Sequence, residues 1–142
     1  MSLKIKVKRL VEDAVIPFKA HPTDSGFDLI AVEDMIIWPF ETKKINTGLA
    51  FELPSNYELQ VRPRSGLSLK TGLKVIFGTV DNSYRGEVGV IAINVSSKEI
   101  LVNKGDKVAQ AVFQKIPDIE LVEVQELNSG DRGVNGFGST GV

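Results

Sequence analysis

The segment RGVNGFGSTG, residues 132–141, combines glycines, hydroxyl groups, an arginine and an aromatic ring. Glycine lets backbone N–H groups approach phosphate oxygens, and the hydroxyls of Ser139 and Thr140 can donate hydrogen bonds to the same oxygens. Arg132 supplies positive charge, and Phe137 offers a flat face for a base. This composition favours an arm that closes over a nucleoside phosphate. The alternative is a frayed glycine-rich chain end.

A second polar segment, RPRSGLS, occupies residues 62–68. Pro63 fixes the entry to a short predicted helix, and Arg64 can form forked hydrogen bonds to an anion. Ser65 and the free N–H groups that follow it would then make an anion cradle at the helix start. The alternative is an ordinary serine N-cap beside a solvated arginine.

A third segment, GTVDNSYRGE at residues 78–87, is interpreted as the tip of a hairpin. Asp81 follows two β-branched residues, so its carboxylate would be held at a strand end, where it can orient a water molecule as a general base. The alternative for Asp81 is an Asx-turn within its own loop. Tyr84 is expected either in the core or with its ring against a sugar.

Three further polar residues need an explanation. Asp28 lies among apolar neighbours at the start of a strand, which is costly unless backbone donors satisfy it or it faces a hydrated cation. Gln110 follows a Gly-Asp turn on a predicted strand, where most glutamines are simply surface residues. His21 is the single histidine and precedes a proline, so nothing supports a His-based triad or metal site.

The elements that must position these residues are mostly strands. Apolar and polar residues alternate with a period of two, and Gly, Asn, Asp and Pro clusters separate the runs. Many short strands at this spacing predict an all-β sandwich or barrel. A short helix is predicted at 65–70. The predicted strands are 3–8, 27–32, 35–38, 43–53, 57–62, 88–94, 99–102, 107–115 and 121–124.

Composition limits the class of protein. The 142 residues fit one domain, and 17 Lys and Arg against 18 Asp and Glu give no basic excess for a nucleic-acid partner. The absence of cysteine excludes disulfides, thiolate metal sites and cysteine nucleophiles. The first ten residues lack the apolar core of a signal peptide, and no run could cross a bilayer. We therefore expect a cytoplasmic protein with no membrane partner.

Five ordered segments together resemble the homotrimeric deoxyuridine triphosphatases (dUTPases): SGFDLIA, RPRSGLSLK, GTVDNSYRGE, KGDKVAQ and RGVNGFGSTG. The resemblance implies a jelly-roll-like distorted β-barrel that assembles as a homotrimer, with active sites shared between subunits. Residues 1–127 would form the barrel domain, and residues 128–142 would form a flexible arm that closes over the active site.

The same resemblance implies an activity. The enzyme would hydrolyse dUTP to dUMP and diphosphate by in-line attack of water on the α-phosphorus, with Mg2+ on the triphosphate. It would thereby limit uracil incorporation into DNA and supply dUMP for thymidylate synthesis. This agrees with the residues themselves, because phosphoryl-type displacement needs positioning and charge stabilisation, and a hydrated Mg2+ suits oxygen ligands.

The resemblance also assigns roles to residues. The catalytic residues would be Asp81, which orients the water, and Arg64. The phosphate-binding residues would be Arg64, Ser65, Gly66, Gln110, Arg132, Ser139 and Thr140. The base- and sugar-binding residues would be Gly78, Thr79, Val80, Asp81, Tyr84, Phe137 and Gly138. Asp28 would hold the metal ion through water.

Base selection would rest on the backbone of the predicted hairpin from Gly78 to Tyr84, in a space too narrow for the methyl group of thymine. Tyr84 beneath the sugar would leave no room for a 2′-hydroxyl. Two positions depart from the usual family pattern: Ser83, where many relatives have an acidic residue, and Asn135, where many have glycine. Asn tolerates left-handed backbone, so Asn135 is expected to bend the arm as glycine would.

Three alternatives remain at this stage. A deoxycytidine triphosphate deaminase shares the fold family, but the sequence offers neither that enzyme's glutamate nor its doubled serine after Arg64. A nucleotide-sensing module would keep the pocket without turnover, although the intact Asp81 and complete arm favour an enzyme. A β protein without a ligand would leave five clustered polar motifs unexplained.

Overall fold

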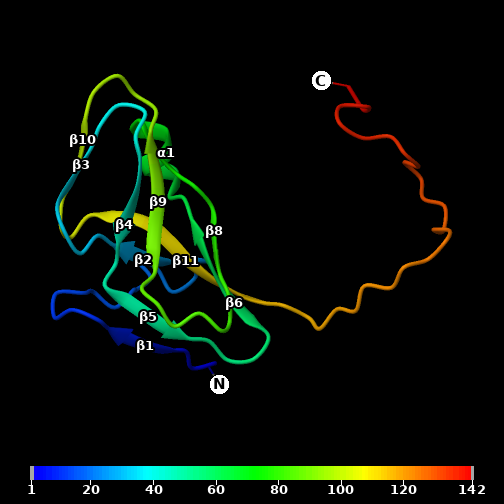
Figure 1. Ribbon diagram of the computed structural model, residues 1–142, viewed down its shortest axis with the longest axis horizontal. Coiled ribbons are helices and arrows are strands. Elements are labelled where there is room, and N and C mark those ends of the chain that lie inside the picture. The colour runs from blue at the N-terminus through cyan, green and yellow to red at the C-terminus, as the bar shows by residue number, and fades with distance from the viewer. Residues whose placement is uncertain (1, 142) are drawn as a thin grey trace.

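Short strands with alternating buried and exposed side chains make up most of the regular structure in the computed structural model of the chain (Figure 1). The structure describes residues 2–141, and Met1 and Val142, which belong to the predicted domain and arm, lie outside the described residues. In chain order the elements are β1 (Lys6–Arg9), β2 (Phe27–Ile30), β3 (Met35–Ile37), β4 (Thr42–Asn46), β5 (Leu49–Glu52), β6 (Tyr57–Arg62), α1 (Ser65–Lys70), β7 (Leu73–Val75), β8 (Gly78–Val80), β9 (Gly89–Asn94), β10 (Ile100–Val102) and β11 (Lys107–Lys115).

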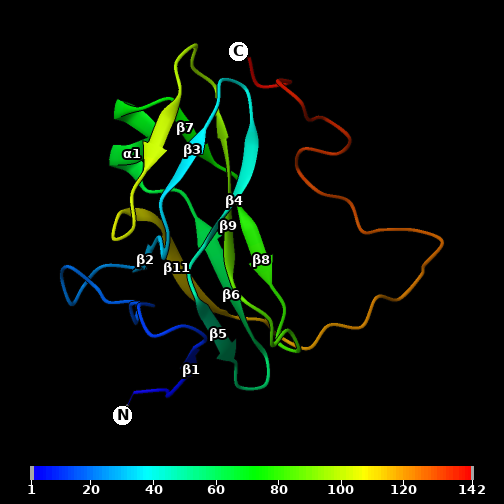
Figure 2. The ribbon, with the colours of Figure 1, turned by 60° about the vertical axis from the view of Figure 1, so that its left-hand side comes forward.

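The strands form small antiparallel sheets wrapped around one core. The largest sheet has the order β2-β11-β6-β8, and a second has the order β4-β9-β7. Two pairs, β1 with β5 and β3 with β10, cover the ends of the barrel. Figure 2 shows these layers from the side, with α1 near one end and β1 with β5 near the other. This arrangement confirms the predicted all-β, jelly-roll-like distorted barrel.

The period-two pattern explains how each strand faces the core. In β6, Leu59 and Val61 are buried while the residues between them are only half-buried, and β9 buries Val90 and Ala92 in the same alternating way. Leu29 of β2 is also fully buried in this cluster. Burial of these apolar side chains is the main stabilising contribution to the barrel.

Two strand predictions are wrong. The predicted strand 43–53 is divided into β4 and β5 at Gly48, which has a φ of 71° and lies where a Cβ atom would be 2.9 Å from the Cβ atom of Ala14. The pattern at 121–124 is also not a strand, although it alternates. Among the described residues, no neighbouring strand pairs with that segment, and strand structure needs a partner.

The hairpin predicted at residues 78–87 is wrong as well. β8 pairs with β6, whereas β9 pairs with β4 and β7 in a different sheet. The residues between β8 and β9 therefore form a loop that connects two sheets. This loop, residues 81–88, is called the β8–β9 loop below.

Beyond Lys115 the chain leaves the barrel as an exposed, extended segment (Figure 1). Its left-handed residues include Gly133, Phe137 and Gly138, whereas Asn135 does not adopt this conformation, contrary to expectation. In residues 2–141, no helix is long and apolar enough to span a membrane.

Candidate active site

Sheet pairing brings together three of the polar segments. Within the four-stranded sheet, Gln110 of β11 pairs with Asp28 of β2 on one side and with Arg62 of β6 on the other. The chain leaves β6 through Pro63 and enters α1 at once, which places Arg64 beside this row. Residues far apart in the sequence thus meet at one end of the sheet.

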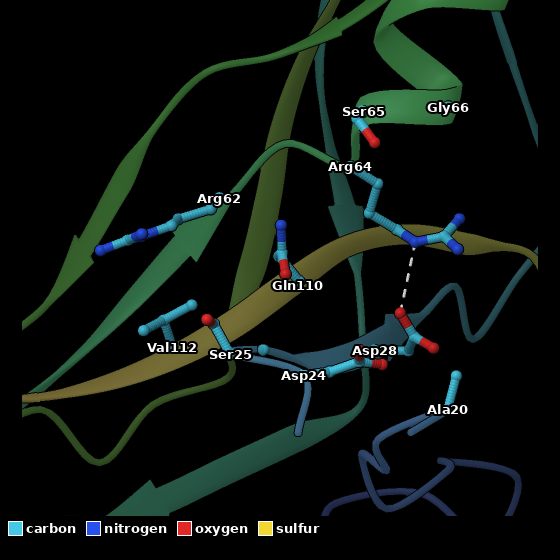
Figure 3. A pocket seen from close by; sticks show the side chains of 11 residues that line it. Ala20, Asp24, Ser25, Asp28, Arg62, Arg64, Ser65, Gly66, Gln110 and Val112 are labelled. Atoms are coloured by element: carbon cyan, nitrogen blue, oxygen red, sulfur yellow. Dashed lines mark ion pairs between the residues drawn. The ribbon is translucent and has the colours of Figure 1, made fainter. Parts of the chain in front are cut away.

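These residues line an open pocket of about 470 Å³. Figure 3 shows the side chains of Arg64, Asp28 and Gln110 around its centre, with Ser65 above them at the start of α1. The lining residues are Ala20, Asp24, Ser25, Gly26, Asp28, Arg62, Arg64, Ser65, Gly66, Gln110 and Val112. The structure therefore brings together the predicted phosphate-binding residues Arg64, Ser65, Gly66 and Gln110 with the predicted metal-site residue Asp28.

Asp28 is held by two basic side chains. Its Oδ1 atom lies 3.2 Å from Nε of Arg64, and its Oδ2 atom lies 3.4 Å from Nζ of Lys107. Only 12% of the Asp28 side chain is exposed, so these cations offset much of the cost of burying its charge. Lys107 was not predicted as a site residue, although it belongs to the KGDKVAQ segment that supplies Gln110.

Arg64 precedes the first turn of α1 and serves as its N-cap residue, without a side-chain capping bond. The alternative that Ser65 is an ordinary N-cap is therefore wrong. The hydroxyl of Ser65 is exposed at the pocket, and a Cβ atom on Gly66 would meet nothing within 4 Å. Space and unused donors thus remain for an anion at this position.

Gln110 is oriented by its neighbours. Its Nε2 atom donates a hydrogen bond of 2.9 Å to the backbone oxygen of Pro63. Gly26 packs directly against it, because a Cβ atom at Gly26 would lie 2.3 Å from Oε1 of Gln110. Glycine at this position is thus required by the position of Gln110.

We expect Gly26→Ala to displace Gln110 and to reduce the stability of the protein by about 1–3 kcal/mol, because the added methyl group has no room. Chemical unfolding and phosphate-ligand titration would measure both effects. Gly105→Ala is not a suitable control because Gly105 has a φ of 95°, whereas Gly130→Ala is, since open space surrounds Gly130. Unchanged ligand affinity in Gly26→Ala would show that the position of Gln110 does not matter.

Asp81 lies in a different place. It is exposed and lines a second pocket of about 470 Å³ with residues of the β5–β6 turn. Val80 of β8 pairs with Leu59 of the antiparallel strand β6, so the next residue, Asp81, lies opposite Glu58. Glu58 is four residues from Arg62 along β6. This separation is about 13 Å at the usual rise per strand residue. One chain therefore does not bring Asp81 to the pocket that contains Arg64.

The predicted base- and sugar-binding residues lie near Asp81. Gly78–Val80 form β8, whose hydrogen-bonded neighbour within the described residues is β6 alone, so its other edge presents unpaired backbone groups. The Tyr84 side chain is on the surface, with 48% of the residue exposed, and its hydroxyl donates to the backbone oxygen of Glu87 at 2.9 Å. The alternative that Tyr84 is a core residue is wrong.

The predicted arm residues lie apart from both pockets. Arg132, Phe137, Gly138, Ser139 and Thr140 are all exposed in the segment that leaves the barrel. Figure 1 shows this segment curving away from the barrel. None of these five residues lines the pocket with Arg64 or the pocket with Asp81. The structure thus separates the predicted site residues into three groups: the pocket with Arg64, the β8 edge with the loop that follows it, and the arm.

The pocket can hold a metal ion only indirectly. Within residues 2–141, no group of three or more His, Cys, Asp and Glu side chains could bind a metal ion. Two carboxylates, those of Asp24 and Asp28, nevertheless line the pocket with the phosphate-binding donors. This donor set fits a hydrated Mg2+ that is bound mainly by phosphate oxygens and contacts the protein through water.

An all-β barrel whose open pocket gathers Arg64, Ser65, Gln110 and two carboxylates has the features of a protein that binds a phosphorylated small molecule. A family model described as dUTPase matches residues 12–141. The chain belongs to the dUTPase family, as its motifs predict.

Similar proteins agree over nearly the whole chain. A deoxyuridine 5'-triphosphate nucleotidohydrolase of Hydrogenobaculum sp. is 49% identical, with 99% of each chain covered. A protein of the same description from Clostridium novyi is 48% identical, with 99% of this chain and 100% of the relative covered. A solved structure of a Staphylococcus bacteriophage 80alpha dUTPase mutant with dUpNHpp has a TM-score of 0.93 at 29% identity, covering 99% of this chain and 100% of that one.

Proposed function

We propose that the protein is a dUTP diphosphatase, which hydrolyses dUTP to dUMP and diphosphate. Family membership and the relatives described as deoxyuridine 5'-triphosphate nucleotidohydrolases support this function. The observation that carries it is the pocket in which Arg64, Ser65 and Gln110 converge beside Asp28. The likeness to the 80alpha dUTPase with dUpNHpp also supports a uracil nucleoside triphosphate as the substrate.

In the proposed complex, Arg64, Ser65, Gly66 and Gln110 bind the phosphate oxygens. Arg64 forms charge-assisted hydrogen bonds that strengthen as negative charge develops. Mg2+, when bound, neutralises charge on the triphosphate, and Asp28 would hold it through water. A solved dUTPase of the S. aureus phage phi11, with a TM-score of 0.83 and 29% identity, is described with a structural Mg(II) ion.

Asp81 provides the base. Its carboxylate accepts a hydrogen bond from water and aligns the water oxygen with the α-phosphorus. A new bond forms between this oxygen and the α-phosphorus while the bond to the bridging oxygen of the diphosphate breaks. The proton of the water passes to Asp81. No covalent intermediate with the protein is required.

The exposed edge of β8 reads the base. Unpaired backbone N–H and C=O groups of Gly78–Val80 can pair with the acceptor and donor groups of uracil. Cytosine presents an amino donor where uracil presents an acceptor, and such a mismatch can give about 10⁴-fold discrimination. Tyr84 lies beneath the sugar and excludes a 2′-hydroxyl.

The arm, residues 128–142, completes the site by closing over the bound nucleotide. Phe137 stacks on the base with Gly138 beside it, and Arg132, Ser139 and Thr140 bind the phosphates. Stacking of an aromatic side chain on a base contributes about 1–3 kcal/mol. Closure also excludes bulk water from the reacting phosphate.

We further propose that the protein acts as a homotrimer with shared active sites. The separation of Asp81 from Arg64 in one chain supports this, because a second chain could supply the missing group. Apolar side chains in the segment that leaves the barrel are strongly exposed: Ile119 at 71%, Leu121 at 93% and Leu127 at 87%. Their exposure in a single chain indicates a surface that association buries.

Shared sites predict complementation between two inactive variants. Asp81→Asn and Arg64→Ala should each be inactive alone, whereas a refolded equimolar mixture should regain about a quarter of wild-type activity, because a site built from two chains can combine the two intact residues. Activity is measured as diphosphate release, and each variant refolded alone is the control. A mixture that stays inactive would contradict sharing of these residues between chains.

In the cell this activity would limit uracil incorporation into DNA and supply dUMP for thymidylate synthesis, in the cytoplasm. The experiment that tests the proposed function incubates the protein with Mg2+ and each deoxynucleoside triphosphate separately. Formation of dUMP and diphosphate from dUTP alone is expected. Ammonia released from dCTP would instead indicate a deaminase, and dUTP binding without turnover would indicate a nucleotide-sensing module.

A further inference from the structure

The β8–β9 loop carries both Asp81 and Tyr84, and the loop's own side chains of Asn82 and Glu87 attach it to the barrel at separate places. At its end the backbone of Val88 is also held, by hydrogen bonds with Thr47 and Leu49. Asn82 contacts the turn between β5 and β6, and Glu87 contacts the turn between β4 and β5. Asp81 directly precedes Asn82, Tyr84 lies between Asn82 and Glu87, and both Asp81 and Tyr84 are exposed. The positions of Asp81 and Tyr84 therefore depend on the hydrogen bonds that Asn82 and Glu87 make with the barrel.

Asn82 forms the first contact. Its Nδ2 atom lies 3.2 Å from the backbone oxygen of Leu53, 2.6 Å from that of Pro54 and 3.3 Å from that of Tyr57. These carbonyl groups surround a turn closed by a hydrogen bond of 3.2 Å from the N–H group of Tyr57 to the oxygen of Pro54. Because Asn82 directly follows Asp81, this contact fixes the backbone next to the proposed base.

Glu87 forms the second contact. Its Oε2 atom accepts a hydrogen bond of 2.8 Å from the N–H group of Gly48, and the next residue, Val88, is only 1% exposed. The backbone oxygen of Glu87 accepts the hydrogen bond of 2.9 Å from the hydroxyl of Tyr84. The Glu87 carboxylate thus holds the backbone group that orients the ring of Tyr84.

Gly86 further restricts the position of the Tyr84 ring. A Cβ atom at Gly86 would lie 2.4 Å from the hydroxyl oxygen of Tyr84 and 2.5 Å from its Cζ atom. The ring of Tyr84 therefore packs directly on the backbone between Tyr84 and Glu87. A shift of this backbone must move the ring.

We propose that Asn82 and Glu87 are positioning residues with separate effects, Asn82 acting through Asp81 on the chemical step and Glu87 acting through Tyr84 on selection of deoxyribose. The inference rests on the proposed dUTP hydrolysis. The two contacts use different turns of the barrel, so loss of one leaves the other in place. A displacement of about 1 Å in a reacting group can cost about 100-fold in rate.

Asn82→Ala removes the donor to three carbonyl groups. We expect kcat for dUTP to fall by about 10–100-fold, while the ratio of kcat/KM for dUTP over UTP stays within about threefold of wild type. Steady-state kinetics with both nucleotides measures the two quantities. If Asn82→Ala does not fold, Asn82→Ser keeps one donor, and the same pattern is expected with a smaller loss.

Glu87→Ala should affect sugar selectivity and leave kcat for dUTP nearly unchanged. We expect the dUTP-over-UTP ratio to fall by about tenfold, while kcat for dUTP stays within about threefold of wild type. Glu87→Gln keeps an oxygen that can accept the bond from Gly48 and should restore the wild-type ratio. A general loss of loop structure would not be rescued in this selective way.

Ser83→Ala is the matched control, because Ser83 is exposed in the same loop and its hydroxyl takes part in no hydrogen bond within the described residues. The inference would be overturned if both variants lost kcat and sugar selectivity in parallel, or if neither variant lost either. The proposed function would still stand in that case, provided that the wild-type protein hydrolyses dUTP. Absence of dUTP turnover in the wild-type protein would overturn the proposed function and this inference together.

Discussion

We expect Asp81→Asn to lower kcat for dUTP hydrolysis by about 10²–10⁴-fold, which is the usual contribution of a general base. The amide keeps the size of the side chain but accepts a proton far less readily, so water is no longer activated. Asp81 is exposed and none of its side-chain atoms takes part in an ion pair within residues 2–141. The substitution should therefore leave folding and dUTP binding close to wild type.

The measurement combines diphosphate release with calorimetric titration of dUTP and thermal unfolding. Asp118→Asn is the matched control, since Asp118 is another exposed acid that lines the same pocket as Asp81. Full activity in Asp81→Asn would contradict the role of Asp81 as the base. Loss of dUTP binding along with activity would assign Asp81 to binding instead.

Removal of residues 130–142 should lower kcat/KM for dUTP by about 10²-fold or more. The truncation removes the stacking of Phe137, about 1–3 kcal/mol, and the charge-assisted hydrogen bonds of Arg132, about 1.5–3 kcal/mol. The free energy of unfolding should change by less than about 0.5 kcal/mol, because the described residues of this segment pack against no part of the core.

Two point variants separate the contributions within the arm. Phe137→Leu should weaken dUTP binding through loss of the stack alone, whereas Asp131→Asn, an exposed neighbour without a proposed role, should behave as wild type. Steady-state kinetics and chemical unfolding of the truncated protein test the prediction itself. A truncated protein with full activity would show that the arm does not close over the substrate.

Local sequence patterns predict the elements whose structure is decided locally. The helix at Ser65–Lys70 has the predicted bounds, because Pro63 marks its start within the local sequence. Strand β6 also has the predicted bounds, since its apolar residues alternate. The 43–53 segment alternates in the same way, yet Gly48 within it has a φ of 71° and packs closely against Ala14 and Val11, which are distant in the sequence. Such a contact is not visible in a local pattern.

The candidate site likewise combines features that are visible in local sequence and features that depend on long-range pairing. Arg64, Ser65 and Gln110 can each be predicted as a candidate phosphate-binding residue, because each lies within a recognisable motif. Their meeting depends on the register of β11 between β2 and β6, which joins residues distant in sequence. The pairing of Lys107 with Asp28 also depends on this fold and was missed. The loop after β8 was predicted as a hairpin because the pairing of β8 with β6 is likewise long-range.

The central proposal is hydrolysis at the α-phosphorus of dUTP by a water molecule that Asp81 orients. Turnover of dUTP in water enriched in oxygen-18, followed by mass spectrometry of both products, tests it most directly. The account predicts that the label enters dUMP and that diphosphate remains unlabelled. Label in the diphosphate would contradict it, because the water would then have attacked the β-phosphorus.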